Sequence, residues 1–212
     1  DTDDVYRDGI MDFVHLYHRL EDEISSPFFL KGYGLNMSPK KLLLEIPYRN
    51  VKRIDDKDLW RRLFTNDVIV WFEHDPFWTE IGYHTTTTGS IKNGFKRAIA
   101  NFQSGITFWS YINFHLKELL FAEYGNRRSG AYQTAIGPMA WIKSRSLEQY
   151  TLPEQFKKKE ALKEAIRAEK CSGVKELNEK YGLKIEPEEF SEVGQRAFFR
   201  ETPSFDDPKV IF

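Results

Sequence analysis

The sequence predicts a mainly α-helical protein with one long central helix at about 91–124, shorter flanking helices and extended, aromatic-rich connectors. The strongest evidence is the stretch 98–116, which contains no Asp, Glu, Lys or Arg. Most other segments place apolar residues at helical spacing, and only the run DVIVWF at 67–72 has a strong strand composition. Aromatic residues reach 15% of the chain, and many lie in segments that Pro and Gly interrupt. We therefore expect little β-sheet and several segments that lie on other surfaces.

Composition narrows the classes of function. Hydrophobic residues make up 41% and charged residues 30% of the chain, proportions that are ordinary for a folded protein. The formal net charge is −1, which argues against a protein that binds duplex nucleic acid through an excess of Lys and Arg. Cys171 is the single cysteine, so the chain forms neither an internal disulfide nor a cysteine metal cluster.

The first predicted helix begins at Asp3 or Asp4 and runs to about Ile24, with its apolar residues on one face. On the opposite face, the spacing of Asp12 and His15 fits a metal site or, alternatively, a solvated surface with local ion pairs.

The connector 25–48 carries many apolar side chains between its Pro and Gly residues, so it must lie on its own core or on a partner. Short helices are predicted at 40–46, directly after Pro39, and at 57–64. The strand predicted at 67–72 has no evident pairing strand, which argues against a large sheet.

The densest group of reactive side chains lies at 73–84. Four of them could supply metal ligands or an acid–base pair, namely His74, Asp75, Glu80 and His84. Pro76 and Gly82 interrupt the helical spacing that an HExxH zinc motif needs. The aromatic neighbours of these residues indicate a packed loop as the alternative.

The central helix is expected to begin after Ser90 and to end at Gly125. Its stretch 98–116 would be about 28 Å long, a length that allows a single membrane span. Four apolar side chains are predicted to face lipid, namely Phe102, Ile106, Trp109 and Ile112. Ser104 and Thr107 lie on a small face that suits close approach of a partner helix. A buried helix of a soluble domain and a helix on a membrane surface are the alternatives.

A second uncharged stretch at 129–142 has Arg127 and Arg128 before it and Lys143 and Arg145 after it. It is too short to span a bilayer, and the Gly137-Pro138 pair predicts a break in any helix there. The stretch either lies at a membrane interface or on a partner, or forms a buried irregular connection.

The C-terminal part begins with charged helices predicted at 154–170 and 173–181. The tail 194–212 is predicted to be an extended arm that anchors Phe198, Phe199 and Phe205 in a neighbouring molecule. The changes in composition divide the chain into an N-terminal helical region at 1–90, a central region at 91–145 and a C-terminal region at 146–212.

Together these features predict a non-catalytic structural subunit of a large, membrane-bound complex. In general build the chain resembles accessory subunits of mitochondrial inner-membrane complexes, such as the respiratory complexes or ATP synthase. The resemblance is architectural and is carried by no motif. It implies other protein subunits and membrane lipid as partners, without nucleic acid, metal or cofactor. A soluble metal-dependent hydrolase or nuclease that uses the 73–84 cluster, and a soluble helical adaptor, are the alternatives.

Overall fold

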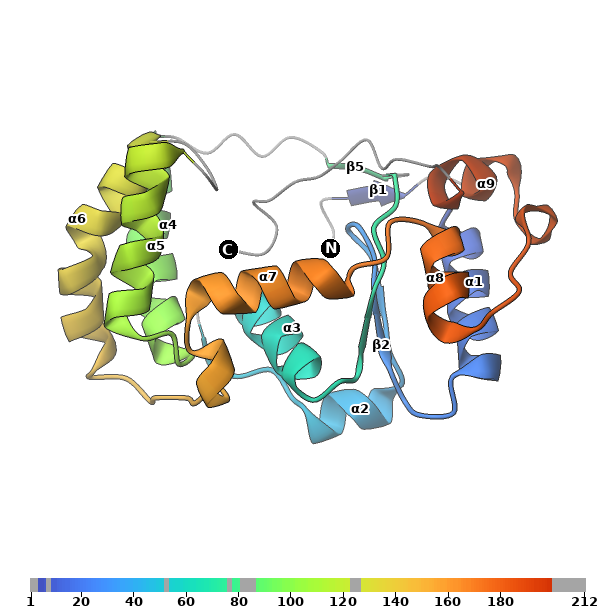
Figure 1. Cartoon of the computed structure of the whole chain (residues 1–212), viewed down its shortest axis with the longest axis horizontal. Helices are drawn as coiled ribbons and strands as arrows, with labels where there is room; N and C mark the ends of the chain where they lie inside the picture. The colour runs from blue at the N-terminus through green and yellow to red at the C-terminus, as the bar shows by residue number, and fades with distance from the viewer. Residues whose placement is uncertain are drawn as a thin grey trace. The chain divides into compact units, whose positions relative to one another are not determined.

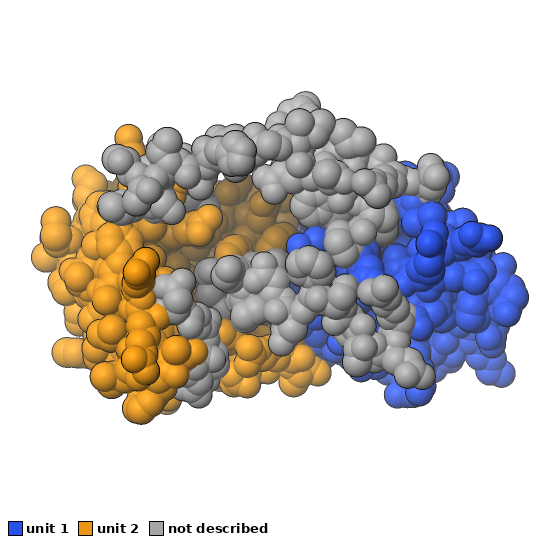
Figure 2. Space-filling model, turned by 90° about the horizontal axis from the view of Figure 1, so that it is seen from above, with its two compact units in different colours: residues 1–46, 66–84, 169–206 blue, residues 47–65, 85–168, 207–212 orange. Residues whose placement is uncertain are grey.

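The computed structural model describes residues 4–6, 9–51, 54–75, 78–80, 87–122 and 127–199 (Figure 1). Over these residues the chain is mainly helical, with nine α-helices and five short strands, which confirms the mainly helical part of the predicted fold class. The chain forms two compact units, coloured separately in Figure 2. Unit 1 comprises residues 1–46, 66–84 and 169–206, and unit 2 comprises 47–65, 85–168 and 207–212. Each unit therefore joins segments that are far apart in the sequence, and the three regions expected from composition stay a prediction.

Unit 1 combines short strands with helices. Its elements are β1 (Asp4–Tyr6), α1 (Gly9–Glu23), β2 (Phe29–Lys31), β3 (Asn36–Met37), α2 (Lys40–Glu45), β4 (Ile69–Trp71), β5 (Trp78–Glu80), α8 (Val174–Tyr181), a 3₁₀ turn (Pro187–Glu189) and α9 (Glu192–Phe198).

The strand predicted at 67–72 is confirmed as β4, and it has a partner after all. β4 pairs in parallel with β2, which places Val70 opposite Leu30, and β2 pairs antiparallel with β3. β1 pairs antiparallel with β5, so the first predicted helix begins only at Gly9. The side chains of Leu16, Leu30, Val70, Leu177 and Phe198 meet in one apolar core.

Unit 2 is helical in the residues that the structure describes. Its elements are α3 (Asp55–Thr65), α4 (Thr87–Gln103), α5 (Phe108–Phe121), α6 (Arg127–Ser144), a 3₁₀ turn (Glu154–Phe156) and α7 (Lys159–Glu169), of which α7 belongs to the unit as far as Ala168. α6 packs against both α4 and α5, and Figure 1 shows these three helices beside one another.

The single helix predicted at about 91–124 is divided in the structure into α4 and α5. Between them Gly105 has φ +103°, a conformation that residues with a Cβ rarely adopt. The backbone N–H of Tyr150 donates to the carbonyl of Gln103 at 2.8 Å, and a Cβ at Gly105 would lie 2.9 Å from the nitrogen of Leu152. The helix thus ends where a distant segment packs against its backbone. Among the described helices, none is both long enough and apolar enough to cross a membrane.

α6 runs without interruption through the Gly137-Pro138 pair, where the sequence predicts a break. Two glycines bring α6 close to α5. A Cβ at Gly130 would lie 2.5 Å from the backbone nitrogen of Leu119, and one at Gly137 would lie 2.5 Å from Cδ1 of Ile112. Gly130 and Gly137 hold α6 before Pro138, and the buried residues Ala140 and Ser144 hold it afterwards. This packing compensates for the hydrogen bond that proline cannot donate.

Candidate functional site

Three of the four side chains predicted to face lipid are instead buried in unit 2. Phe102, Ile106 and Ile112 are at most 9% exposed, and the Phe102 ring packs on Tyr111 with 4.7 Å between ring centroids. They are buried because α4 and α5 are separate helices that pack with α6, not one continuous span. Trp109 differs, since 71% of its surface is exposed.

The small face predicted to contact a partner helix is split between the interior and the surface. Ser104 is fully buried, and the Arg61 guanidinium of α3 donates to its hydroxyl at 3.4 Å and to the side-chain Oδ1 of Asn101 at 3.0 Å. Ser104 therefore does meet a helix, but one of its own chain. Thr107 is exposed and accepts a hydrogen bond at its carbonyl from the Tyr111 N–H.

The predicted C-terminal arm is folded onto unit 1 over the part that the structure describes. Phe198 lies on α9 in the core of unit 1, fully buried, with its ring 5.4 Å from the Phe72 ring centroid. Phe199 is half-buried and packs against Phe190. Phe205 lies outside the described residues, so its anchoring role stays a prediction.

His74, the first residue of the predicted metal or acid–base cluster, is buried among Phe13, Phe72 and Phe198. Its Nδ1 donates to the Asp75 carbonyl at 2.8 Å, and its Nε2 accepts the Tyr33 backbone N–H at 3.0 Å. Burial lowers the pKa of His74 to about 4, which keeps the ring neutral. Since both nitrogens are engaged, a metal could bind this ring only after one of these bonds is broken.

The other members of that cluster are not assembled into a site by the described residues. Asp75 is half-buried, and its backbone N–H donates to the Ala197 carbonyl at 3.2 Å. Glu80 ends β5, but its side chain is not described, and His84 lies outside the described residues. Within the described residues, no group of three His, Cys, Asp or Glu side chains is placed to hold a metal.

A buried charged cluster on α5 and α7 was not expected from the sequence. His115 Nδ1 donates to the Glu118 carboxylate, and its Nε2 lies 3.1 Å from Nζ of Lys159. All three residues are at most 6% exposed, and the Lys159 ammonium lies 4.4 Å from the centroid of the Phe114 ring. The carboxylate, imidazole and amine thus form a continuous chain of hydrogen bonds inside unit 2.

This order of groups resembles an acid–base relay in its chemistry. Burial lowers the pKa of Lys159 well below its ordinary value, and nearby Arg61 acts in the same direction. Burial, followed by the Lys159 charge, lowers the pKa of His115 to about 4, although Glu118 acts in the opposite direction. A relay needs contact with a substrate, however, and the Lys159 side chain is 2% exposed. We therefore interpret the cluster as a polar joint between α5 and α7.

The sequence did contain a signal for this cluster. The buried residues of α7 follow a helical stripe, namely Lys159, Leu162, Lys163 and Ile166. Two lysines thus occupy positions on the apolar face, whereas composition alone indicates a solvated run of lysines.

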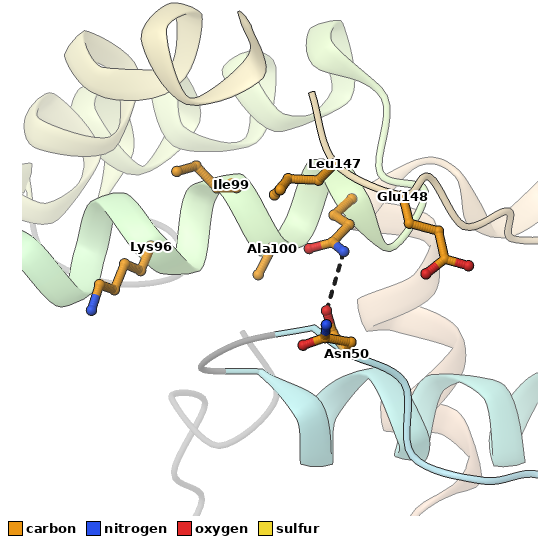
Figure 3. A pocket seen from close by; sticks show the side chains of 7 residues that line it. Asn50, Lys96, Ile99, Ala100, Leu147 and Glu148 are labelled. Carbon is orange, nitrogen blue, oxygen red and sulfur yellow. Dashed lines mark hydrogen bonds between the residues drawn. The ribbon is translucent and has the colours of Figure 1, made fainter. Parts of the chain in front are cut away.

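Unit 2 also contains a pocket of about 300 Å³, at the lower end of the range for small-molecule sites (Figure 3). Its lining consists of Asn50, Lys96, Ile99, Ala100, Gln103, Leu147 and Glu148. The amide of Gln103 donates to the Asn50 carbonyl at 3.2 Å, the dashed line in Figure 3. These seven residues provide one amine and one carboxylate but no hydroxyl, thiol or imidazole. The pocket is therefore suited to holding a small amphipathic molecule.

The most unusual surface is on α5 and α6. Among the described residues, ten large hydrophobic side chains are exposed, and six of them lie on these two adjacent helices. We call them the α5–α6 surface: Trp109, Leu120, Phe121, Met139, Trp141 and Ile142. The Phe108 ring lies 5.1 Å from Trp109 and 5.5 Å from Trp141, so these two tryptophans belong to one continuous aromatic group.

Comparisons with known proteins add no assignment, since no family model, no curated protein and no solved structure matches the chain.

Proposed function

We propose that the chain is a non-catalytic structural subunit of a larger, membrane-bound assembly, of the kind that mitochondrial respiratory complexes or ATP synthase contain. The observation that carries this proposal is the α5–α6 surface. Neighbouring protein subunits and membrane lipid would cover it, at the mitochondrial inner membrane.

The aromatic side chains of this surface are more exposed than is usual for a surface that faces only water. Trp109 and Phe121 are 71% and 69% exposed, although each carries an aromatic ring that favours burial. Scattered single apolar residues are ordinary on a protein surface, but a continuous aromatic group marks a contact with another molecule. Covering one such ring stabilises an interface by about 1.5–3 kcal/mol.

The internal packing of unit 2 explains why these side chains do not turn inward. The opposite side of α6 presents Gly130, Gly137 and Ala140 to the unit, and the Tyr111 hydroxyl donates to Gln133 at 2.6 Å. Rotation of α6 would push large side chains into these close contacts. The α6 part of the α5–α6 surface therefore stays outside, and another molecule is needed to bury it.

The size of the native particle that contains the chain in its own cells tests this proposal. We expect the tagged chain, extracted from membranes in a mild detergent, to migrate on native gels in a particle several times its 25.0 kDa mass. The double substitution Trp109→Ser and Phe121→Ser should release it from that particle, because both rings lose their contact. Leu44→Ser, which changes a 69% exposed residue on α2, is the matched control and should leave the particle intact.

Two results would contradict the proposal. One is a wild-type chain that migrates as a free monomer after gentle lysis. The other is a particle that loses the chain equally after the Trp109 and Phe121 substitutions and after the Leu44 substitution.

A further inference from the structure

We propose that α6 lies flat on an anionic lipid surface, with its exposed face among the headgroups and its basic ends on lipid phosphates. This inference rests on the proposed function, because it names what covers the α6 part of the α5–α6 surface.

The exposed side of α6 is apolar from Ala131 to Ile142. At helical spacing, one row runs through Ala131, Ala135, Pro138 and Ile142, with Met139 and Trp141 on either side of it, and all six residues are exposed. We call this set the α6 face. A helix that faces water usually carries charged residues there, yet 129–142 contains none. These residues span 131–142 of the 18-residue helix, so the face extends over about 18 Å.

Positive charge is concentrated at the two ends of this face. Arg127 and Arg128 begin the helix, Lys143 and Arg145 stand at its end, and all four side chains are exposed. The segment 127–147 contains no Asp or Glu, although the whole chain has a net charge of −1. The partner surface that complements this face is therefore an apolar zone bordered by anions.

A lipid surface supplies that arrangement more directly than a protein does. Anionic headgroups lie above an acyl region over any length, so they can meet cations at both ends of the helix and apolar groups between them. The Arg145 guanidinium lies 5.8 Å from the Trp141 ring centroid, which places a cation beside an aromatic ring, as at membrane interfaces. Gly130 and Gly137 fix the rotation of α6, so this face is presented outward without rearrangement.

Flotation of the purified chain with vesicles tests the inference. We expect binding to vesicles of phosphatidylcholine with about 30% phosphatidylglycerol and much weaker binding to phosphatidylcholine alone, since each basic residue near the surface contributes about fivefold to affinity. Raising NaCl from about 0.05 M to about 0.5 M should release the chain, because salt screens these charges.

Substitutions on the α6 face and at its basic C-terminal end separate the apolar from the electrostatic contribution to vesicle binding. Lys143→Gln with Arg145→Gln should weaken binding to the anionic vesicles about 25-fold. Met139→Gln with Ile142→Gln should weaken it by at least about tenfold through lost apolar contact. Both pairs are exposed, so circular dichroism should show an unchanged fold. The matched controls on α2, Lys41→Gln and Leu44→Gln, should bind like the wild type.

The outcomes distinguish this inference from the proposed function. If the wild type fails to float, or if the α6 variants bind like the α2 controls, α6 does not contact lipid and the inference is overturned. Loss of the native particle in those same α6 variants would then show that a protein covers the α6 face, and the proposed function would stand. Lipid binding that needs the α6 face in a chain that forms no particle would instead support the inference and overturn the proposed function.

Discussion

Asp12 on α1 accepts two hydrogen bonds from Ser191, a residue 179 positions later in the chain. The Ser191 backbone N–H lies 3.0 Å from Oδ1 of Asp12, and the Ser191 hydroxyl lies 2.5 Å from Oδ2. Ser191 is also the N-cap of α9, and its hydroxyl accepts the Gly194 N–H at 3.3 Å. One carboxylate therefore fixes the start of α9, and α9 in turn carries Phe198 into the core of unit 1.

Removal of this carboxylate should destabilise unit 1. We expect Asp12→Ala to lower the free energy of unfolding by about 2–3 kcal/mol, because charged hydrogen bonds are lost and the Ser191 N–H is left without its acceptor. Urea denaturation measures the loss, and hydrogen exchange should be faster in α9. Asp22→Ala changes an exposed residue of the same helix and should cost less than about 0.5 kcal/mol. Equal losses in the two variants would show that Asp12 does not anchor α9.

The contact between α5 and α6 should be most sensitive at Gly130. A Cβ there would meet backbone atoms, 2.5 Å from the Leu119 nitrogen and 2.8 Å from the His115 carbonyl oxygen, and neither can move alone. At Gly137 the nearest atom is the end of the Ile112 side chain, which can rotate. We therefore expect Gly130→Ala to cost about 3 kcal/mol and Gly137→Ala about 1 kcal/mol. Thermal or urea unfolding that reverses this order would contradict the packing.

Stability should fall as the pH decreases below 6.5, because His74 is neutral in the folded chain. Burial lowers its pKa from 6.5 to about 4, so the unfolded chain takes up the proton first. This contribution is fully present above pH 6.5 and is lost as the pH falls toward 4. The free energy of unfolding should lose about 1.4 kcal/mol per pH unit for each such histidine, and His115 acts with the same sign.

The substitution His74→Gln isolates this effect. The variant should lose about half of the histidine-dependent slope between pH 6.5 and 4, whatever its stability at neutral pH. Urea denaturation at a series of pH values measures the slope. An unchanged slope would mean that His74 is already protonated in the folded chain, in conflict with its acceptance of the Tyr33 N–H.

Local patterns were sufficient to predict the helices that depend on their own residues. The helix predicted at 57–64 is observed as Asp55–Thr65, and the one at 173–181 as Val174–Tyr181. In both, apolar spacing and end signals act within a few residues. The uncharged stretch at 129–142 and its basic ends were also visible in the sequence, although not its helical form through Pro138.

The candidate site was less predictable, because burial depends on partners that are distant in sequence. Lys159 belongs to a run of three lysines that looks solvated, yet His115 and Phe114 of α5 enclose it. His74 has the chemistry of a ligand, but Tyr33 and Asp75 engage its two nitrogens. No local pattern records these contacts.

Local sequence patterns alone establish that the chain is mainly helical, that one short strand lies at 67–72, and that a segment without charge has cations at both ends. These properties follow from spacing and composition within single segments. Long-range packing is what ends the first half of the predicted central helix at Gln103, where the backbone around Tyr150 packs on it. Long-range packing also buries Phe102 and Ile112 while it leaves Trp109 exposed. The physical reason is that a helix continues or ends, and a side chain is buried or exposed, according to which distant backbone and side chains occupy the space beside it.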